Sequence, residues 1–340
     1  MIRNVYGLDL GSYEIKVYDK KHDSIWKEKS VISIENRKEI IAVGDEAYQM
    51  YEKVPDNIQV EFPMKKGVIS QFNDMQYLLS SLLKKDVRFT RGSEYVIAVP
   101  TDVTEVEKKA FFDLVIHSNA KAKEVNIVER GIADAVGLNL DVRNTKGIFI
   151  ANFGGDTTEF SIIAGGGLVL NRLLKVGGSD CDQAITQLVK YSHDFLIGHT
   201  AAETLKKEFG IYGKEQSATL RVAGRDLITG VPQHREIAGN LVRSALQEPL
   251  EECVSAIQSM LDRTPPEVRK AIYKNGIFLT GGMANLPGLE AYLEGATGIR
   301  VRTAVEPVTC SVAGLREIIK SKELKKLAYS MLDEHYRWMR

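Results

Sequence analysis

Short apolar runs alternate along this chain with amphipathic stretches, a pattern that predicts alternating strands and helices. Apolar runs bounded by glycine, proline or polar residues indicate strands. We expect strands at residues 5–10, 15–19, 31–34, 40–43, 95–99, 148–152, 159–163 and 169–176. Apolar residues three and four positions apart predict helices at residues 75–83, 104–119, 180–190, 201–209, 236–262 and 313–340. The predicted fold is therefore α/β, with a sheet in each half of the chain.

One residue interrupts this pattern. Pro249 falls inside the long helical stretch at 236–262. Because proline lacks a backbone N–H and its ring crowds the preceding turn, it is predicted to break or kink that helix.

Composition narrows the class of protein. A chain of 340 residues is long enough for two domains, each with its own core. Its 45 Lys and Arg residues balance 45 Asp and Glu residues, so charge gives no reason to expect a nucleic-acid partner. The 3 cysteines have no paired spacing, which favours a reducing cytoplasm over a disulfide or zinc framework. No apolar run approaches the roughly 18 residues of a membrane span, so we expect a soluble cytosolic protein.

Three glycine turns carry the candidate chemistry. In the first, the strand containing Asp9 runs into Gly11-Ser12, and in the second the strand ending in Asn152 runs into a Gly-Gly-Asp-Thr turn at 154–157. Glycine lets the backbone bring its N–H groups against an anion, and the hydroxyl adds a donor. Two such hairpins facing each other would hold a polyphosphate between two related halves. The third turn, at 279–284, lies between a strand-like and a helix-like run, which suits a nucleoside lying over bare backbone.

Further motifs extend these turns into a family resemblance. They lie at residues 43–47, 63–69, 99–110, 177–185, 224–227, 246–250, 265–267 and 307–310. With them, the chain resembles the MreB family of bacterial actins over about residues 5–318. The resemblance implies an actin-like fold of two RNase H-like halves, each with a smaller inserted subdomain, and a nucleotide cleft between them. The implied subdomains are IA (1–31, 68–138 and 311–340), IB (32–67), IIA (139–178 and 244–310) and IIB (179–243).

The resemblance also implies a site for ATP or ADP with Mg²⁺. The implied nucleotide-binding residues are Asp9, Gly11, Ser12, Tyr13, Glu14, Lys16, Asn152, Gly154, Gly155, Asp156, Thr157, Glu203, Thr204, Leu205, Lys206, Gly281, Gly282, Met283 and Ala284. Asp9 and Asn152 are the implied metal residues, acting through Mg²⁺-bound water. The implied partners are further copies of the chain, the inner membrane face and the cell-wall synthesis machinery, with a cytoplasmic, membrane-peripheral location.

The chain departs from the family pattern where hydrolysis takes place. The family's Asp-Ile-Gly-Gly-Gly-Thr becomes Asn152-Phe153-Gly154-Gly155-Asp156-Thr157, which removes one charge that supports Mg²⁺. The family's Glu-Glu-Pro becomes Glu129-Arg130-Gly131. Arg130 therefore replaces the carboxylate expected beside the attacking water, and it can neutralise phosphate charge but cannot position that water. In a shifted register Glu129 would take the positioning role.

Two other assignments remain open at this stage. Lys16 occupies the place of a phosphate-loop lysine in eukaryotic actin, or it is a solvated strand residue. Glu203 and Lys206 face the ribose and adenine by resemblance, or they form an ordinary exposed helix pair.

These residues predict a cytoskeletal protein that binds adenine nucleotide, forms membrane-associated filaments and helps determine cell shape, with ATP hydrolysis weak or lost. One alternative is a competent ATPase in which Asp156 or Glu129 replaces the missing carboxylates. Another is a non-polymerising adaptor of a pilus or division assembly, which the run at residues 7–12 also resembles.

Two segments bear on membrane contact. In the loop at 84–91, Val87 and Phe89 are surrounded by four basic residues, so the loop either inserts weakly into anionic lipid or is simply solvated. The tail at 320–340 has an apolar stripe in helical spacing. It is either an interfacial helix or a last helix that docks on its own domain.

Overall fold

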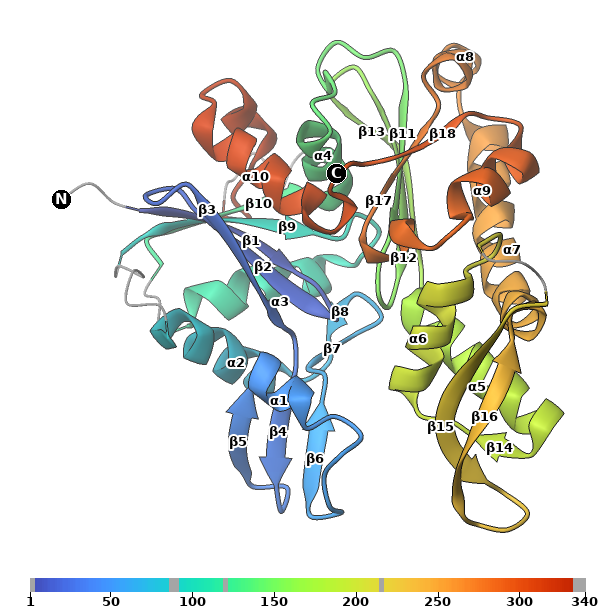
Figure 1. Ribbon diagram of the computed structural model, residues 1–340. Coiled ribbons are helices and arrows are strands. Elements are labelled where there is room, and N and C mark those ends of the chain that lie inside the picture. The colour runs from blue at the N-terminus through green and yellow to red at the C-terminus, as the bar shows by residue number, and fades with distance from the viewer. Residues whose placement is uncertain (1–3, 86–91, 119–121, 214–216, 333–340) are drawn as a thin grey trace. The chain divides into compact units, whose positions relative to one another are not determined.

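The chain forms two compact units (Figure 1). The computed structural model describes residues 4–85, 92–118, 122–213 and 217–332. Unit 1 comprises Met1–Lys146, Glu159–Leu173 and Val308–Arg340, and unit 2 comprises Gly147–Thr158 and Leu174–Pro307. The finer division into four subdomains remains a prediction.

Unit 1 is built on a five-stranded sheet with helices on both faces (Figure 1). The strand order is β10 (Glu124–Glu129), β9 (Glu94–Val99), β1 (Val5–Leu10), β2 (Glu14–Asp19) and β3 (Ser24–Lys29). β10, β9 and β1 run parallel, and β1, β2 and β3 form an antiparallel meander. One face is covered by α4 (Arg130–Gly137) and α10 (Cys310–Lys320), the other by α2 (Phe72–Lys85) and α3 (Glu105–Ile116). Asp9 therefore lies near the end of β1, just before the first glycine turn. Glu129 is the last residue of β10 and directly precedes α4.

Smaller elements complete unit 1. β4 (Ile32–Glu35) pairs with both β5 (Glu39–Val43) and β6 (Ile58–Glu61), and α1 (Asp45–Gln49) follows β5. β7 (Met64–Lys65) and β8 (Val68–Ile69) form a short ladder. The hairpin strands β12 (Thr158–Ala164) and β13 (Gly167–Leu174) lie almost wholly in this unit.

Unit 2 combines a parallel sheet with a separate antiparallel one. β11 (Ile148–Phe153), β17 (Ile277–Thr280) and β18 (Val301–Thr303) pair in parallel, together with α7 (Gly239–Arg263), α8 (Pro266–Asn275) and α9 (Leu289–Thr297). β14 (Phe195–Leu196), β15 (Thr219–Asp226) and β16 (Pro232–Ala238) form the second sheet, which accompanies α5 (Gly178–His193) and α6 (His199–Phe209). The short helix η1 (Gly282–Asn285) follows β17 and contains the third glycine turn.

Two predicted helices are wrong in their extent. The stretch at 236–262 begins as strand β16, because residues 219–238 form a continuous antiparallel hairpin, and only then becomes α7. Pro249 lies inside α7 and does not end it, since the helix continues to Arg263. The helix predicted at 313–340 ends at Lys320.

The segment after α10 packs on unit 1 in another form. A 3₁₀ turn spans Leu324–Leu327, and Tyr329 then forms an isolated antiparallel bridge with Ile127 of β10. Tyr329 and Met331 pack against the core of the unit. Residues 321–332 therefore do not form a continuous amphipathic helix, and residues 333–340 lie outside the described part of the chain.

The three cysteines lie in the packed interior. Cys181, Cys253 and Cys310 are buried and are free cysteines in the described structure. Burial raises the pKa of the Cys181 thiol to about 12, which keeps it protonated and unreactive. Within the described ranges, no helix has the length and apolar character needed to cross a membrane.

Candidate functional site

The first two glycine turns share one local geometry. A side-chain Cβ on Gly11 would lie 2.7 Å from the carbonyl oxygen of Glu14, and a Cβ on Gly154 would lie 2.8 Å from that of Thr157. Each position therefore requires glycine, because its backbone lies so close to the carbonyl oxygen of the third residue after it that a Cβ would not fit. This shared constraint is why the two stretches look alike in sequence.

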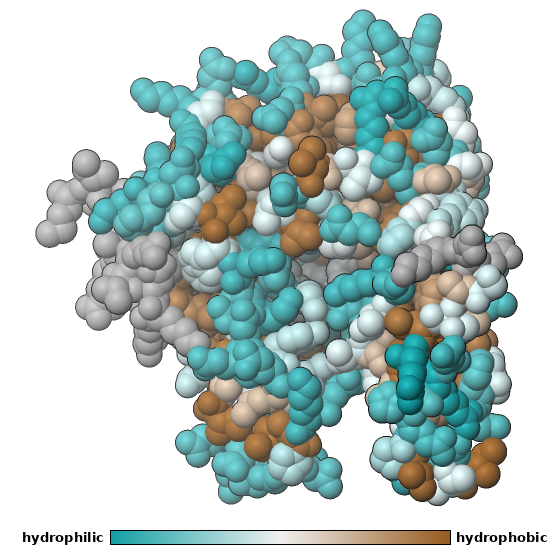
Figure 2. All heavy atoms as spheres, viewed as in Figure 1, coloured by the Kyte–Doolittle hydropathy of each residue, from teal (hydrophilic) through white to brown (hydrophobic). Residues whose placement is uncertain are grey.

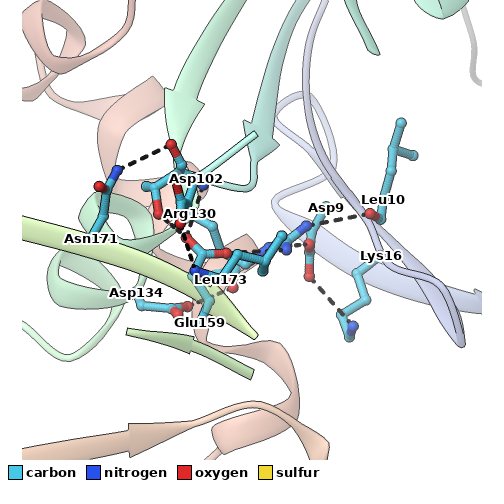
Figure 3. A network of polar contacts seen from close by, with 11 residues as sticks. Asp9, Leu10, Lys16, Asp102, Arg130, Asp134, Glu159, Asn171 and Leu173 are labelled. Carbon is cyan, nitrogen blue, oxygen red and sulfur yellow. Dashed lines mark hydrogen bonds and ion pairs between the residues drawn. The ribbon is translucent and has the colours of Figure 1, made fainter. Parts of the chain in front are cut away.

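In unit 1, the turn after β1 lies beside a buried cluster of charges (Figure 3). The guanidinium of Arg130 lies between two carboxylates: Nε is 3.5 Å from Oδ1 of Asp9, and Nη1 is 3.5 Å from Oε2 of Glu159. Nη2 donates to the Leu10 carbonyl oxygen at 3.4 Å. The Lys16 ammonium lies 3.4 Å from the other oxygen of Asp9. The solvated reading of Lys16 is thus wrong, because its side chain is only 11% exposed.

Glu159 is held in place from a different direction. Its Oε1 accepts hydrogen bonds from the Thr101 backbone N–H at 3.1 Å and from the Thr101 hydroxyl at 2.7 Å. Burial raises the pKa of Glu159, and the nearby Arg130 and the Thr101 hydrogen bonds offset only part of that rise. Burial alone would lower the pKa of Arg130, but Asp9 and Glu159 raise it above its usual value. Arg130 is therefore a permanent cation at this place.

Glu129, the alternative water-positioning residue, has a partner elsewhere. Its Oε1 accepts a hydrogen bond of 2.6 Å from the hydroxyl of Tyr329, in the segment after α10. Of the two neighbours, Arg130 is the one whose side chain reaches Asp9.

Tyr13 and Glu14, at the end of the first turn, contact strand β3. The Lys29 ammonium lies 4.0 Å from the centre of the Tyr13 ring and 3.4 Å from Oε1 of Glu14. The Tyr13 hydroxyl is 3.0 Å from that of Tyr48, which belongs to α1. These contacts orient both side chains within unit 1 and leave Ser12 partly exposed at the turn.

In unit 2, the second turn packs against the start of α5. The N–H groups of Gly178 and Ser179 donate to the carbonyls of Gly154 and Gly155 at 3.1 and 2.7 Å. Asp156 accepts a 2.6 Å hydrogen bond from the Ser179 hydroxyl. The Asp156 carboxylate thus lies at the N-terminus of α5, where the helix dipole stabilises an anion.

The third turn lies against the end of β11. Gly281 has φ of 84°, and its N–H donates to the Pro307 carbonyl at 2.8 Å. A Cβ here would lie 2.7 Å from Oδ1 of Asn152, so only glycine fits. Met283 and Ala284 are buried, whereas Gly282 is exposed. Unit 2 therefore brings together Asn152, the second turn and the third turn.

The four candidate residues of α6 have different surroundings. Leu205 is a core residue, and Lys206 is buried with its ammonium 2.7 Å from Asp182 and 2.8 Å from the Gly178 carbonyl. Glu203 pairs with Lys207 at 2.8 Å, and Thr204 is exposed. The reading of Glu203 and Lys206 as an exposed pair is wrong for Lys206, which ties α6 to the start of α5.

The remaining predicted residues, Val87 and Phe89, lie outside the described residues. Three residues that hold the site together were not predicted: Thr101, Glu159 and Tyr329. The sequence contains one feature that could have identified Glu159: it is a charged residue directly before the mostly apolar run at 160–163. Tyr329 had none, because its contact with Glu129 joins segments 200 positions apart.

These surroundings fit an anion better than a divalent cation. Glycine turns, a helix N-terminus and the cations Lys16 and Arg130 are groups that bind phosphate. Mg²⁺ prefers carboxylate and phosphate oxygens. Asp9, however, already has an ammonium and a guanidinium beside its two oxygens, and Asn152 has no charge. Among the described residues, no group of three or more His, Cys, Asp or Glu side chains could hold a metal ion. Taken by itself, each unit offers groups that fit a phosphate, and neither offers a good Mg²⁺ site among its described residues.

Comparison with known proteins agrees with these features. The family model described as MreB/Mbl protein matches residues 3–327. The cell shape-determining protein MreB of Escherichia coli K12 is 35% identical over 323 residues, covering 92% of each chain. The crystal structure of MreB5 of Spiroplasma citri bound to AMPPNP aligns with a TM-score of 0.89 at 27% identity, covering 96% of this chain and 98% of that one. A MamK double helical filament matches with a TM-score of 0.78 at 20% identity, covering 94% and 99%, which is a likeness of fold.

Proposed function

This chain belongs to the MreB/Mbl family, with an actin-like fold, and from that premise we propose that it is a cytoskeletal protein that binds adenine nucleotide and assembles into filaments at the inner membrane face. In this proposal the filaments help determine cell shape by organising cell-wall synthesis, and ATP hydrolysis is weak or lost. The observation that carries the proposal is the set of glycine turns, of which the first has cations beside it and the second has the N-terminus of α5 beside it.

The proposed loss of hydrolysis is supported by the partners of the candidate carboxylates. A competent ATPase needs a carboxylate free to orient water. Glu129 is hydrogen-bonded to Tyr329, Asp156 is hydrogen-bonded to Ser179, and the position between Asp9 and Glu159 belongs to Arg130. Among the described residues, Glu129 and Asp156 each have one carboxylate oxygen engaged within the chain, which favours weak hydrolysis over the competent ATPase.

Self-association is supported by an exposed apolar tip on the β15–β16 hairpin, which Figure 2 shows at the lower right. Leu227, Ile228 and Val231 are 43%, 79% and 52% exposed. Asp226 fixes the loop by accepting from the N–H groups of Ile228 and Thr229 at 2.9 and 2.8 Å. A rigid loop that presents apolar side chains is typical of a protein–protein contact. A MamK structure of the same fold is a double helical filament, whereas the adaptor alternative does not polymerise.

We expect ATP, ADP and AMPPNP each to raise the melting temperature of the purified protein. A ligand that binds only the folded state stabilises it by about 2.7 kcal/mol at a hundredfold excess over Kd. Differential scanning fluorimetry measures the shift, and inorganic triphosphate serves as the control that lacks a nucleoside. Absence of any shift with all three nucleotides at millimolar concentration would contradict nucleotide binding.

We expect filaments, rather than monomers, to co-sediment with anionic vesicles. Each basic residue near the surface contributes about 1 kcal/mol of attraction, and a filament repeats the contact. The variant Phe89→Ser should still form filaments but bind vesicles less, and high salt should weaken binding too. The variant Ile228→Asp places a charge on the exposed tip, so it should form fewer filaments and lose vesicle binding with them.

A truncation after residue 332 is the matched control for the tail. It keeps Tyr329 and its contact with Glu129, which a cut at residue 320 would remove. If the truncated protein no longer binds vesicles while the Phe89→Ser variant still does, the membrane anchor is the tail and not the loop. A protein that stays in the supernatant at all nucleotide concentrations would favour the adaptor alternative.

A further inference from the structure

The two oxygens of Asp9 face two different cations of the chain itself. Lys16 is 3.4 Å from Oδ2 and Arg130 is 3.5 Å from Oδ1. The Asp9 side chain is 7% exposed, so these charges act on it with little solvent screening. A divalent cation approaching Asp9 would be repelled by both neighbours. The negative charge of Asp9, the carboxylate expected to hold a metal-bound water, is thus already balanced by cations of the chain.

The contacts of the Arg130 guanidinium with the described chain are long. Of its five N–H donors, Nε faces Asp9 and Nη1 faces Glu159, each at 3.5 Å, and Nη2 donates to the Leu10 carbonyl at 3.4 Å. Nε has no hydrogen-bond partner in the described structure, although its side chain is only 10% exposed. Buried polar groups normally find partners, so a buried guanidinium with long contacts indicates a place that an anion completes.

The cluster holds Arg130 beside the turn without saturating it. Thr101 fixes one oxygen of Glu159, and the other oxygen faces Arg130 across 3.5 Å. The contact to the Leu10 carbonyl places the guanidinium next to Gly11, where the backbone turns. Arg130 is thus oriented by two acids, Glu159 and Asp9, and lies at the base of the phosphate turn.

Asn152 gives an independent observation in unit 2. It follows the same strand-and-glycine pattern as Asp9 but carries no charge, and its Oδ1 is close to the position a Cβ would take on Gly281. An amide in this packed position adds no negative charge to attract a divalent cation. Each unit therefore lacks a free carboxylate at the position expected to support the metal: in unit 1 Asp9 is paired with cations, and in unit 2 the residue is the uncharged Asn152.

We propose that Arg130 and Lys16 take over the neutralisation of the nucleotide phosphates, so that this chain binds nucleoside di- and triphosphates without a divalent cation. The proposal rests on the proposed nucleotide binding and concerns how the phosphate charge is balanced. No bond is made or broken in this step: the phosphate oxygens share Lys16 and Arg130 with Asp9 and Glu159, which these cations contact at 3.4 to 3.5 Å.

The test is a direct measurement of ATP affinity by isothermal titration calorimetry, in excess Mg²⁺ and in EDTA. We expect the wild-type Kd to differ by less than about threefold between the two conditions. The variant Lys16→Gln removes one cation and should weaken ATP binding in EDTA by about tenfold or more, the effect of one charge-assisted hydrogen bond. In excess Mg²⁺ its loss should be smaller, because the metal then supplies the charge.

Two further variants sharpen the result. Arg130→Gln should behave as Lys16→Gln does, with circular dichroism and a melting curve without nucleotide as the check that it folds. Asn152→Asp restores a carboxylate. This variant should bind ATP more tightly in excess Mg²⁺ than in EDTA. Lys270, which is exposed on α8 and is not among the candidate site residues, provides the matched control: Lys270→Gln should leave both affinities unchanged.

The outcomes separate this proposal from the proposed function. If wild-type protein binds ATP in Mg²⁺ but not in EDTA, the proposal fails while nucleotide binding stands. If it binds under neither condition, nucleotide binding itself fails. If it binds equally well in both but neither Lys16→Gln nor Arg130→Gln weakens binding in EDTA, these two residues are not the neutralising cations.

Discussion

Replacing Arg130 with methionine should lower the free energy of unfolding by about 3–5 kcal/mol at pH 8, as expected when one partner of a buried ion pair is removed. The reason is that Glu159, which is 2% exposed, would lose its facing cation, and Asp9 would keep only Lys16. Urea denaturation followed by circular dichroism measures the change. Methionine keeps most of the side-chain volume, so a cavity contributes little.

A companion variant tests the cause. Arg130→Met combined with Glu159→Gln removes both charges and should recover most of the lost stability, because well-packed neutral groups of similar volume replace buried pairs at little cost. Thr101 can still donate its two hydrogen bonds to the amide oxygen of the glutamine side chain that replaces Glu159. A single Arg130→Met variant as stable as the wild type would contradict the buried position of these charges.

The stability difference should also depend on pH. Burial raises the pKa of Glu159, and Arg130 opposes that rise, so removing Arg130 raises this pKa further. A carboxyl group with a raised pKa in the folded state stabilises the fold below its unfolded value of about 4.3, and that contribution is lost as the pH rises through the folded value. The gap between variant and wild type should therefore grow from acidic to neutral pH.

The local features of this site could be predicted from the sequence. Gly11 and Gly154 stand where a carbonyl three residues on leaves no space for a Cβ, which is a short-range requirement that the residue type itself reveals. The helix expected from residue 104 begins there for a similar reason. Thr104 and Glu107 form a reciprocal capping box, with the Thr104 N–H donating to Glu107 at 2.7 Å.

The partners of the charged residues could not be predicted in this way. Arg130 stood out as a departure from the family pattern, but its position between Asp9 and Glu159 depends on how β1, α4 and β12 pack. The contact between Tyr329 and Glu129 depends on a strand-like segment where helical spacing predicted a helix. Long-range packing decided both, and a local periodicity carries no information about it.

Gly131, like its neighbour Arg130, differs from the family pattern. The family pattern has proline at this position, yet a Cβ on Gly131 would collide with the Ser161 hydroxyl. Residues 130 and 131 at the start of α4 thus match Glu159 and Ser161 on the facing strand β12. The altered segment is therefore accommodated by its surroundings, and a variant that places a carboxylate at position 130 requires changes that these surroundings tolerate.

Phosphate release from ATP by the wild-type protein should be slower than that of a carboxylate-bearing bacterial actin by roughly a hundredfold or more for each of the two missing groups. Arg130 cannot accept a proton or orient water as a carboxylate does, and Asn152 removes a charge that supports Mg²⁺. The double variant Arg130→Glu with Asn152→Asp should raise the rate in the presence of Mg²⁺. A malachite-green assay at saturating ATP measures it.

The structure sets the control for this restoration. The glutamate that replaces Arg130 in the double variant would face Asp9 and Glu159 without a cation between them, so like charges would destabilise the fold. Adding Glu159→Gln removes one of these charges, and the triple variant should therefore hydrolyse ATP at least as fast as the double variant while melting at a higher temperature. Asn152→Asp alone should raise the rate less than the double variant does, because Arg130 still occupies the place where the family pattern has a carboxylate. Brisk hydrolysis by the wild-type protein would instead favour the competent ATPase, with a catalytic base other than the residue at position 130.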